Sequence, residues 1–244
     1  MNNIILFRES LMDQNELFCA KKYFKTVNRR TEIGNNQLVI ARYSCLPYYK
    51  ELEDDCRYQN SHLINSYKQH RYIANMMNWY EDLKGLTPET WQRIEDIPIE
   101  ETGPFILKGE TNSKKFLFDT HFFAKDRNAI TDVYCRLTDD GLIGDQSIYI
   151  RKFVPLKNYL VGLRGLPISD EYRFFCYKEN ILTYGYYWSN YYDDLPVKPY
   201  LDLEEVKPFM NKVMKILSEK TNAYVVDVAR KADGEFIVIG FINV

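Results

Sequence analysis

Residues 104–118 read Pro-Phe-Ile-Leu-Lys-Gly-Glu-Thr-Asn-Ser-Lys-Lys-Phe-Leu-Phe, and residues 147–156 read Ser-Ile-Tyr-Ile-Arg-Lys-Phe-Val-Pro-Leu. The first segment predicts an apolar strand that runs directly into Lys108, then a polar turn, and after Lys115 a second apolar strand. The second segment predicts a strand that is interrupted by a pair of cations, of which Arg151 is the first. We therefore expect a β-rich region that carries basic side chains on its strands.

These cations suggest a site for a polyanion. Side chains alternate along a strand, so Arg151 and Lys152 point to opposite faces. A cation in the middle of a strand is costly to bury unless an anion meets it. Lys108, Lys115 and Arg151 are therefore candidates to converge on a nucleotide triphosphate. The alternative is that the lysines are solvated, as on many edge strands.

The composition is that of an ordinary globular protein. The chain of 244 residues suits one compound domain or two small ones, with 45% hydrophobic and 27% charged residues. Its 20 tyrosines and 14 phenylalanines fit β-rich elements. The net charge of -2 provides no basic field for nucleic acid or for an anionic membrane, so we expect neither partner.

The cysteines and the apolar runs indicate a cytoplasmic protein. The 5 cysteines are scattered without a C-x-x-C spacing, which argues against a disulfide framework or a zinc site. The apolar run near the N-terminus is too short for a signal sequence. No segment approaches about 18 consecutive apolar residues, so no transmembrane span is expected.

The N-terminal part predicts a small α/β unit. Strands are expected at residues 3–7 and 38–43, and helices at residues 16–24 and 48–55, with a parallel pair of strands. In such sheets ligands lie beyond the carboxyl ends of the strands, which makes Arg42 a candidate anion contact. The alternative, a solvated or carboxylate-paired arginine, stays open.

A long helical pattern follows. It covers residues 61–84, and Thr87-Pro88 predicts the start of another helix. The acidic, irregular residues 95–101 predict a linker, so we place a boundary near residue 100.

Strands dominate the C-terminal part. A short strand is expected at residues 133–137, a hairpin at residues 171–188, and strands at residues 224–229 and 235–243. An amphipathic helix is expected at residues 206–217.

Three charged residues of these strands require a partner. Glu171 and Arg173 share a face of the first hairpin arm, which suits them to pair or to present Arg173 to a ligand. Asp227 lies in mid-strand among valines, where a carboxylate is costly without a cation or hydrogen-bond donors.

The order of these motifs resembles the ATP-grasp fold, and specifically a bacterial and phage-associated clade of ATP-grasp domain proteins. The motifs run over nearly the whole chain: Arg42-Tyr43-Ser44, Leu46-Pro47-Tyr48-Tyr49, residues 63–71, Asn78-Trp79-Tyr80, residues 87–91, residues 105–116, residues 150–156, Glu171-Tyr172-Arg173 and Val226-Asp227-Val228-Ala229. The resemblance implies an α+β protein with an N-terminal α/β pre-grasp unit in residues 1–100. It also implies two α+β lobes in residues 101–244 that grip ATP between them.

The resemblance also implies roles for single residues. Lys108 and Lys115 are expected to contact the nucleotide phosphates, and Glu110 is expected to lie in the same cofactor site. The strand with Arg151 is expected to lead into the adenine-binding hinge. The cofactor residues implied there are Arg151, Lys152, Phe153 and Val154.

The remaining implied residues concern catalysis and the metal. Arg173 resembles the arginine beside the transferred phosphate, with Arg151 facing the same phosphates, so both are candidate catalytic residues. Asp227 resembles the first magnesium carboxylate, and Arg42 is the candidate substrate contact. Proteins of this fold usually join a carboxylic acid to an amine through an acyl phosphate, with ATP and Mg²⁺ as cofactors.

One position departs from the family pattern. Gly240 stands where a glutamate of the metal site is expected, and Asn243 is out of step with the asparagine that normally follows. Either Asp227 and Asn243 hold a weaker ion with the help of water, or this copy is degenerate, or the terminus is shortened.

Three functions follow as hypotheses. The first is an ATP-dependent carboxylate–amine ligase that acts on an unknown acid and an unknown amine. The second is an ATP-binding protein of the same fold with little or no ligase turnover. The third is an aromatic module that stacks bases on residues 186–192, where stacking contributes roughly 1–3 kcal/mol per base; a partly buried loop that lines the cleft is the simpler interpretation of those tyrosines.

Overall fold

The computed structural model describes residues 4–42 and 46–243; for residues 46, 47 and 243 it describes only the backbone. Four parallel strands build the N-terminal sheet. The strands run in the order β2 (Lys25–Val27), β1 (Ile4–Phe7), β3 (Leu38–Ala41) and β4 (His62–Leu63). Helices α1 (Gln14–Ala20) and α2 (Leu46–Tyr58) accompany this sheet. Buried side chains such as Ile5, Val39 and Leu52 form its core. The predicted parallel pair is confirmed as β1 and β3.

The single long helix predicted for residues 61–84 is wrong. The segment forms β4 and then two helices, α3 (Tyr67–Ala74) and α4 (Met76–Asp82). The break occurs at Asn75, whose backbone is extended and whose side chain accepts hydrogen bonds from the backbone N–H groups of Met77 and Asn78. Asparagine is a favoured N-cap, so it ends one helix and begins the next although the apolar stripe continues.

The first lobe is built on an antiparallel sheet. Its strands run in the order β5 (Thr90–Trp91), β8 (Ile148–Lys152), β6 (Phe105–Gly109) and β7 (Phe123–Ala124). The strands predicted at residues 105–107 and 148–154 correspond to β6 and β8. Helix α5 (Ile130–Thr138) packs on this sheet through an apolar cluster that includes Phe105, Leu107 and Ile150.

Three sequence predictions in this lobe are wrong. Residues 133–137 belong to α5, because Ile130, Val133 and Leu137 are buried at helical spacing. The residues after Lys115 form a short 3-10 turn (Lys115–Leu117) and a π-helical turn (Phe118–Phe122) instead of a second strand. No helix starts at Thr87, whose hydroxyl donates to the carbonyl of Val238 at 2.9 Å and thereby fixes the segment before β5.

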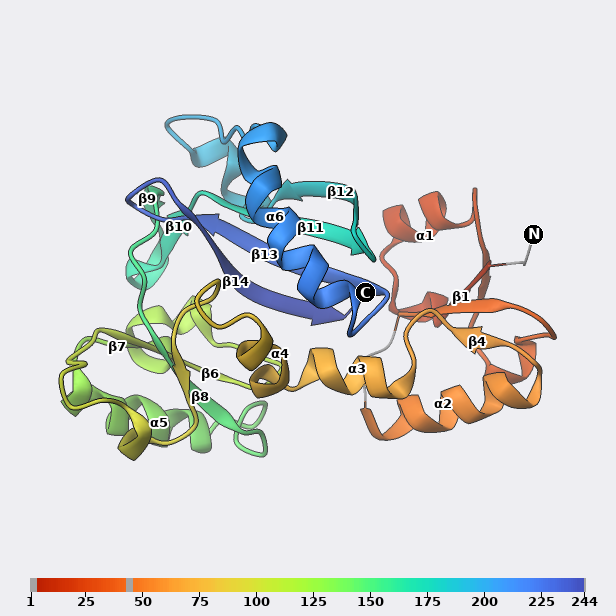
Figure 1. Cartoon of the computed structure of the whole chain (residues 1–244), viewed down its shortest axis with the longest axis horizontal. Coiled ribbons are helices and arrows are strands. Elements are labelled where there is room, and N and C mark those ends of the chain that lie inside the picture. Colours follow the sequence, from red (N-terminus) through yellow and green to blue (C-terminus); the bar gives the residue numbers. More distant parts are fainter. Residues whose placement is uncertain (1–3, 43–45, 244) are drawn as a thin grey trace.

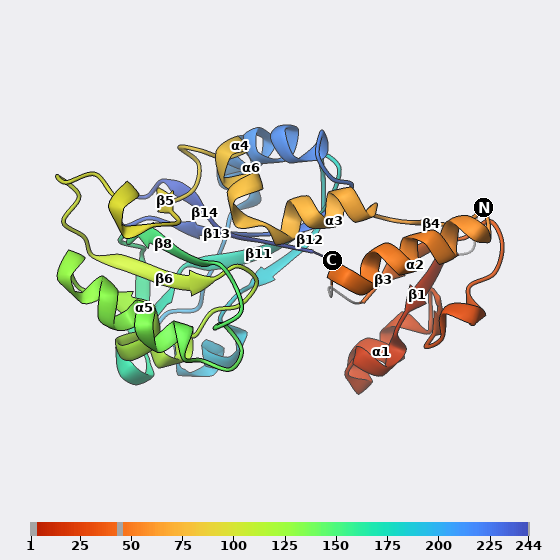
Figure 2. The same ribbon diagram turned by 90° about the horizontal axis from the view of Figure 1, so that it is seen from below.

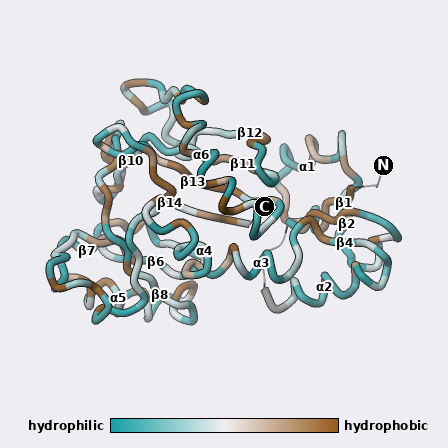
Figure 3. The backbone as a smooth tube through the Cα atoms, in the orientation of Figure 1, coloured by the Kyte–Doolittle hydropathy of each residue, from teal (hydrophilic) through white to brown (hydrophobic). Residues whose placement is uncertain are grey.

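The second lobe is also antiparallel. Its strands run in the order β12 (Asn180–Tyr186), β11 (Glu171–Tyr177), β13 (Ala223–Arg230) and β14 (Phe236–Asn243), as the hairpin and the C-terminal strand pattern predict. Helix α6 (Leu203–Ser218) lies across one face of this sheet (Figure 1). In Figure 3 the hydrophobic colour of β13 marks the core of the second lobe, and that of β1 marks the core of the N-terminal unit.

Alternation along the strands gives the second sheet two different faces. Tyr172 and Phe174 of β11 and Val226 of β13 join the core under α6, to which α3 and α4 also contribute. Glu171 and Asp227 therefore point to the opposite face, toward the first lobe.

The remaining elements are connections. A two-stranded sheet of β9 (Asn158–Val161) and β10 (Pro167–Ser169) links the lobes. Besides Lys115–Leu117, the 3-10 turns in the described part of the chain are Glu9–Leu11, Arg30–Glu32, Ile94–Asp96, Arg127–Ala129, Leu163–Gly165 and Ser189–Asp194. Within the described ranges, no helix is both long enough and apolar enough to cross a membrane.

The N-terminal unit is attached to the second lobe through a buried asparagine. Helix α3 runs from the N-terminal unit toward the lobes (Figure 2). Just before it, the Asn65 amide donates to the carbonyl of Ala223 at 2.6 Å. Its oxygen accepts from Thr221 Oγ1 and from the backbone N–H groups of Asn222 and Ala223 at 2.9–3.1 Å. The start of β13 is thus held by one side chain that is 1% exposed.

Replacement of Asn65 by alanine should destabilise the protein. The substitution leaves buried backbone groups of Ala223 without these hydrogen bonds, and each such group costs about 1–3 kcal/mol. We expect a loss of roughly 2–4 kcal/mol in the free energy of unfolding, measured by urea denaturation. The exposed Asn78→Ala serves as the control and should change stability by less than about 0.5 kcal/mol. An equally small effect of Asn65→Ala would contradict this account.

Candidate functional site

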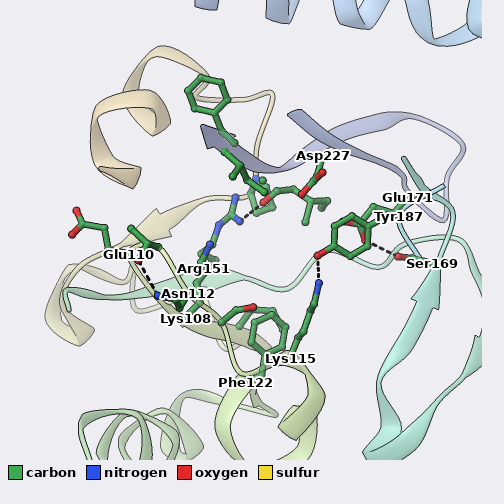
Figure 4. A pocket seen from close by; sticks show the side chains of 18 of the residues that line it. Lys108, Glu110, Asn112, Lys115, Phe122, Arg151, Ser169, Glu171, Tyr187 and Asp227 are labelled. Atoms are coloured by element: carbon green, nitrogen blue, oxygen red, sulfur yellow. Dashed lines mark hydrogen bonds between the residues drawn. The ribbon is translucent and has the colours of Figure 1, made fainter. Parts of the chain in front are cut away.

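A cavity of about 910 Å³ lies between the two lobes and reaches the N-terminal unit. Strands β6 and β8 contribute one wall, and β11, β13 and β14 contribute the other. Lys108, Lys115 and Arg151 all line it, so the structure brings these three cations together as the sequence predicts. Figure 4 shows them entering from the first lobe, with Glu171, Tyr187 and Asp227 on the other side.

Lys108 is placed by the alternation of β6. Its neighbours Phe105 and Leu107 enter the core of the first lobe, so the lysine points to the opposite face, into the cavity. Burial, followed by repulsion from Arg151, lowers the pKa of Lys108 to about 8, although the charge of Asp227 opposes this shift. An anion in the cavity would stabilise the protonated form.

Lys115 reaches the opposite wall from its 3-10 turn. Its Nζ donates a hydrogen bond to the hydroxyl of Tyr187 (Figure 4). The ammonium also lies 4.0 Å from the centroid of the Tyr187 ring and 4.7 Å from that of Trp188. Burial lowers its pKa, against the attraction of Glu171 and Asp227.

Arg151 joins the two lobes. Its guanidinium donates to the hydroxyl oxygens of Thr90 at 3.2 Å and Thr87 at 2.7 Å, and to the carbonyl of Ile239 in β14 at 2.7 Å. The side chain is 5% exposed, and burial lowers its pKa to about 10. Among the residues that the structure describes, no carboxylate forms an ion pair with it, so all these partners are neutral.

The hinge residues also line the cavity. Phe153 and Val154 follow β8, and the N–H of Phe153 donates to the carbonyl of Pro104 at 3.0 Å. Lys152 lines the cavity but forms ion pairs with Glu101 and with Glu89, the latter at 3.8 Å.

Two further residues lie near the ends of the cavity. Glu110 lines it just after β6, with one carboxylate oxygen 3.4 Å from the hydroxyl of Tyr149. Arg42 lines the part that reaches the N-terminal unit, and its Nε lies 2.7 Å from Glu16 Oε1. The carboxylate-paired alternative for Arg42 is therefore the one that the structure contains.

Asp227 has a cation as its partner. Arg173 lies opposite Asp227 in the strand register and donates to both carboxylate oxygens, at 2.8 and 2.9 Å. Arg173 is not among the residues that line the cavity, and its guanidinium lies 4.8 Å from the centroid of the Tyr187 ring. Of the two alternatives that the sequence left open for Arg173, pairing with Glu171 does not occur. Its guanidinium instead bonds Asp227, which lies directly opposite on the neighbouring strand.

Glu171 is held by a different set of groups. Trp188 Nε1 and Ser169 Oγ donate to its carboxylate at 3.1 and 3.2 Å. Burial, followed by repulsion from Asp227, raises the pKa of Glu171 to about 7, although Lys115 and these hydrogen bonds act against the shift.

The described residues do not fit the magnesium site that the resemblance implies. Gly240 lies opposite Asp227, and a Cβ added to it would be 3.1 Å from Asp227 Oδ2. The position is thus directed at the carboxylate, but glycine supplies no oxygen ligand. Throughout the described ranges, no three His, Cys, Asp or Glu side chains gather closely enough to hold a metal. The side chain of Asn243 lies outside the described part of the structure.

Sequence reasoning missed several residues of this site. Thr87 and Thr90 hold Arg151, and Tyr187 and Trp188 contact Lys115. The interpretation of the tyrosine-rich segment as a loop that lines the cleft is confirmed for Tyr187. The signal for the threonines was weak, because a hydroxyl that accepts from a distant arginine has no characteristic spacing.

Known proteins share this architecture. The structure is similar to that of a RimK domain protein ATP-grasp from Sphaerobacter thermophilus DSM 20745, with 17% identity, a TM-score of 0.63, and coverage of 98% of this chain and 90% of that chain. It is also similar to a D-alanine–D-alanine ligase from Bacillus anthracis complexed with ATP, with 11% identity, a TM-score of 0.61, and coverage of 99% and 86%. A carboxyaminoimidazole ribonucleotide synthase from Aspergillus clavatus complexed with ATP matches with 10% identity, a TM-score of 0.60, and coverage of 99% and 70%. At these identities the likeness shows the fold.

The family is given by the sequence itself. No protein of curated function matches the chain. The family model that matches describes an ATP-grasp domain, namely family 3 of one ATP-grasp clade. The match covers residues 64–243, which is more than half of the chain. The predicted fold class is confirmed, and the chain belongs to this clade family of the ATP-grasp domain proteins.

Proposed function

We propose that the protein binds ATP in the cavity between its lobes and carries out little or no ligase turnover. Binding is supported by Lys108, Lys115 and Arg151, which line one cavity from the first lobe. The similarly folded ligase and synthase that are complexed with ATP also support it. The adenine would lie at the hinge, against Phe153 and Val154.

The pair of Asp227 and Gly240 carries the proposal of low turnover. In a carboxylate–amine ligase, ATP transfers its terminal phosphoryl group to an acid, and the amine then displaces phosphate from the acyl phosphate. Neutralisation of the migrating charge is the main catalytic requirement. Here both carboxylate oxygens of Asp227 already accept hydrogen bonds from Arg173, and Gly240, opposite Asp227, adds no carboxylate.

Ligase activity is the second candidate. The cavity extends past the cations to Leu11 and Arg42, and about 910 Å³ is near the upper end of the range for ligand pockets. That leaves room for a second substrate beside a nucleotide. Arg42 would contact its carboxylate after release from Glu16.

ATP affinity should depend on the charge of Lys108. The wild-type affinity, measured by calorimetry between pH 7 and 9, should fall above pH 8, because Lys108 with a pKa of about 8 loses its proton there. Lys108→Arg stays charged and should remove this part of the pH dependence. Lys108→Ala should weaken binding roughly 10–100-fold at pH 7, the effect of losing a charged hydrogen bond.

A matched control separates this effect from a general loss of positive charge. Lys125 is exposed and lies outside this cavity. Lys125→Ala should keep the wild-type affinity and pH profile. Equal affinities of Lys108→Ala and the wild type would remove Lys108 from the site.

Turnover should appear only when a carboxylate is added at position 240. With Mg²⁺ and a panel of amino acids and short peptides as acids and amines, the wild type should bind ATP but release no ADP above the rate without protein. Gly240→Glu should increase ADP release, because it places a second carboxylate beside Asp227. Gly240→Gln has the same shape without the charge and should stay at the wild-type level.

The opposite outcome would favour the second candidate. If the wild type released ADP only when both an acid and an amine were present, the protein would be a ligase, and Gly240 would be compatible with catalysis.

A further inference from the structure

The carboxylate of Asp227 is engaged on both oxygens. Arg173 donates to Oδ1 through Nε and to Oδ2 through Nη2, at 2.8 and 2.9 Å. Asp227 is 4% exposed, whereas the Arg173 side chain is 34% exposed, so solvent reaches the pair only from the arginine side. A charge-assisted bidentate pair of this kind is among the strong hydrogen-bonded contacts. Coordination of a metal by Asp227 would require it to give up at least part of this pair.

The neighbouring position offers nothing in exchange. Gly240 faces Asp227 across β13 and β14, where a Cβ would approach Oδ2 to 3.1 Å. Mg²⁺ demands near-octahedral oxygen ligands and is usually held by one or two carboxylates together with substrate phosphates. Opposite Asp227, whose two oxygens are engaged by Arg173, position 240 therefore supplies no oxygen ligand.

The opposite wall already supplies positive charge. Lys108 and Arg151 line the cavity, and within the described ranges neither forms an ion pair with a carboxylate. Lys115 donates to a neutral phenol, that of Tyr187. On the same wall as Asp227, Oε2 of Glu171 accepts hydrogen bonds from Trp188 and Ser169. Arg151 is buried and the two lysines are partly buried, and cations in such surroundings without an ion-pair partner complement a polyanion directly.

We infer that the cavity takes its nucleotide as a metal-free polyphosphate, with Lys108, Lys115 and Arg151 neutralising the charge that a divalent ion would otherwise neutralise. Asp227 then serves as the partner of Arg173. This inference rests on the proposed ATP site and assigns the charge state of its ligand.

The direct test compares ATP affinity with and without the metal. Calorimetry on the full chain at pH 7.5 should give equal or tighter binding of ATP in EDTA than in saturating Mg²⁺, because magnesium removes two negative charges that the lysines would contact. Binding at least about tenfold tighter in Mg²⁺ would overturn the inference and leave the ATP site in place. Absence of binding in both buffers would overturn the ATP site and this inference together.

Substitution of Asp227 should change ATP affinity in opposite directions, depending on whether Asp227 is only the partner of Arg173 or a metal ligand. Asp227→Asn removes a negative charge near the phosphates, so ATP binding in EDTA should tighten about threefold to tenfold through the Coulomb term. If Asp227 were a metal ligand, the same substitution would weaken binding in Mg²⁺. Circular dichroism would first establish that the variant folds, since Arg173 loses its anionic partner.

A second variant keeps the Asp227 pair and adds charge instead. Gly240→Glu should weaken ATP binding in EDTA by about tenfold, and Mg²⁺ should restore it, because two adjacent carboxylates need a cation between them. Gly240→Gln brings the same Cβ and similar bulk into the cavity without the charge, so it should keep the wild-type ratio of affinities in EDTA and in Mg²⁺ whatever its steric effect on both. Equal binding of Gly240→Glu in EDTA and Mg²⁺ would contradict the inference, because position 240 would then lie away from the phosphates.

Discussion

The buried guanidinium of Arg151 is the contact on which the cavity depends. It extends from β8 of the first lobe and donates to a carbonyl of β14 in the second lobe, as well as to two threonines that precede or begin β5. Removing such a charge from water costs several kcal/mol, which is recovered only while its hydrogen bonds are intact. A displacement of the lobes would break the bond to Ile239 and leave the charge less well satisfied. The separation of the two walls, and therefore the space between Lys108 and Asp227, follows from this constraint.

The second lobe adds a polar face by simple alternation. Tyr172 and Phe174 of β11 and Val226 of β13 enter the core under α6. On the other face of the same strands, Glu171 and Asp227 line the cavity. Arg173 and Asp227 meet across the two strands because the register places them opposite one another. The same register places Gly240 opposite Asp227, so one substitution in β14 determines whether a second carboxylate lies directly across from Asp227.

The strands of the site could be predicted from sequence, and its helices less well. Alternating apolar residues and turn signals located β6, β8, β11 and β13, because these patterns depend on local geometry. The helix predicted for residues 61–84 failed at Asn75, where capping of a new helix outweighs the apolar stripe. Residues 133–137 were misassigned because a short apolar run does not distinguish a strand from a buried helix face.

The partners of the charged residues were harder to predict than the residues themselves. Lys108, Lys115 and Arg151 line one cavity, as the sequence predicts, because cations beside apolar strands need an anion. Lys115, however, reaches the cavity from a 3-10 turn and not from a strand. The sequence suited Arg173 either to pair with Glu171, two residues away, or to be presented to a ligand, whereas in the structure it pairs with Asp227 from a distant segment. Such a pairing depends on strand register, which a sequence does not specify over this separation. The threonines that hold Arg151 were missed for the same reason.

The central claim is that three basic side chains of the first lobe surround the phosphates of a nucleotide. A crystal structure of the full chain with a non-hydrolysable ATP analogue, grown without divalent ions, tests it most directly. We expect phosphate oxygens at hydrogen-bond distance, about 2.7–3.2 Å, from the nitrogens of Lys108 and of Lys115 or Arg151. Phosphates bound elsewhere, with the contact between Lys115 and Tyr187 unchanged and the cavity empty of the analogue, would contradict it.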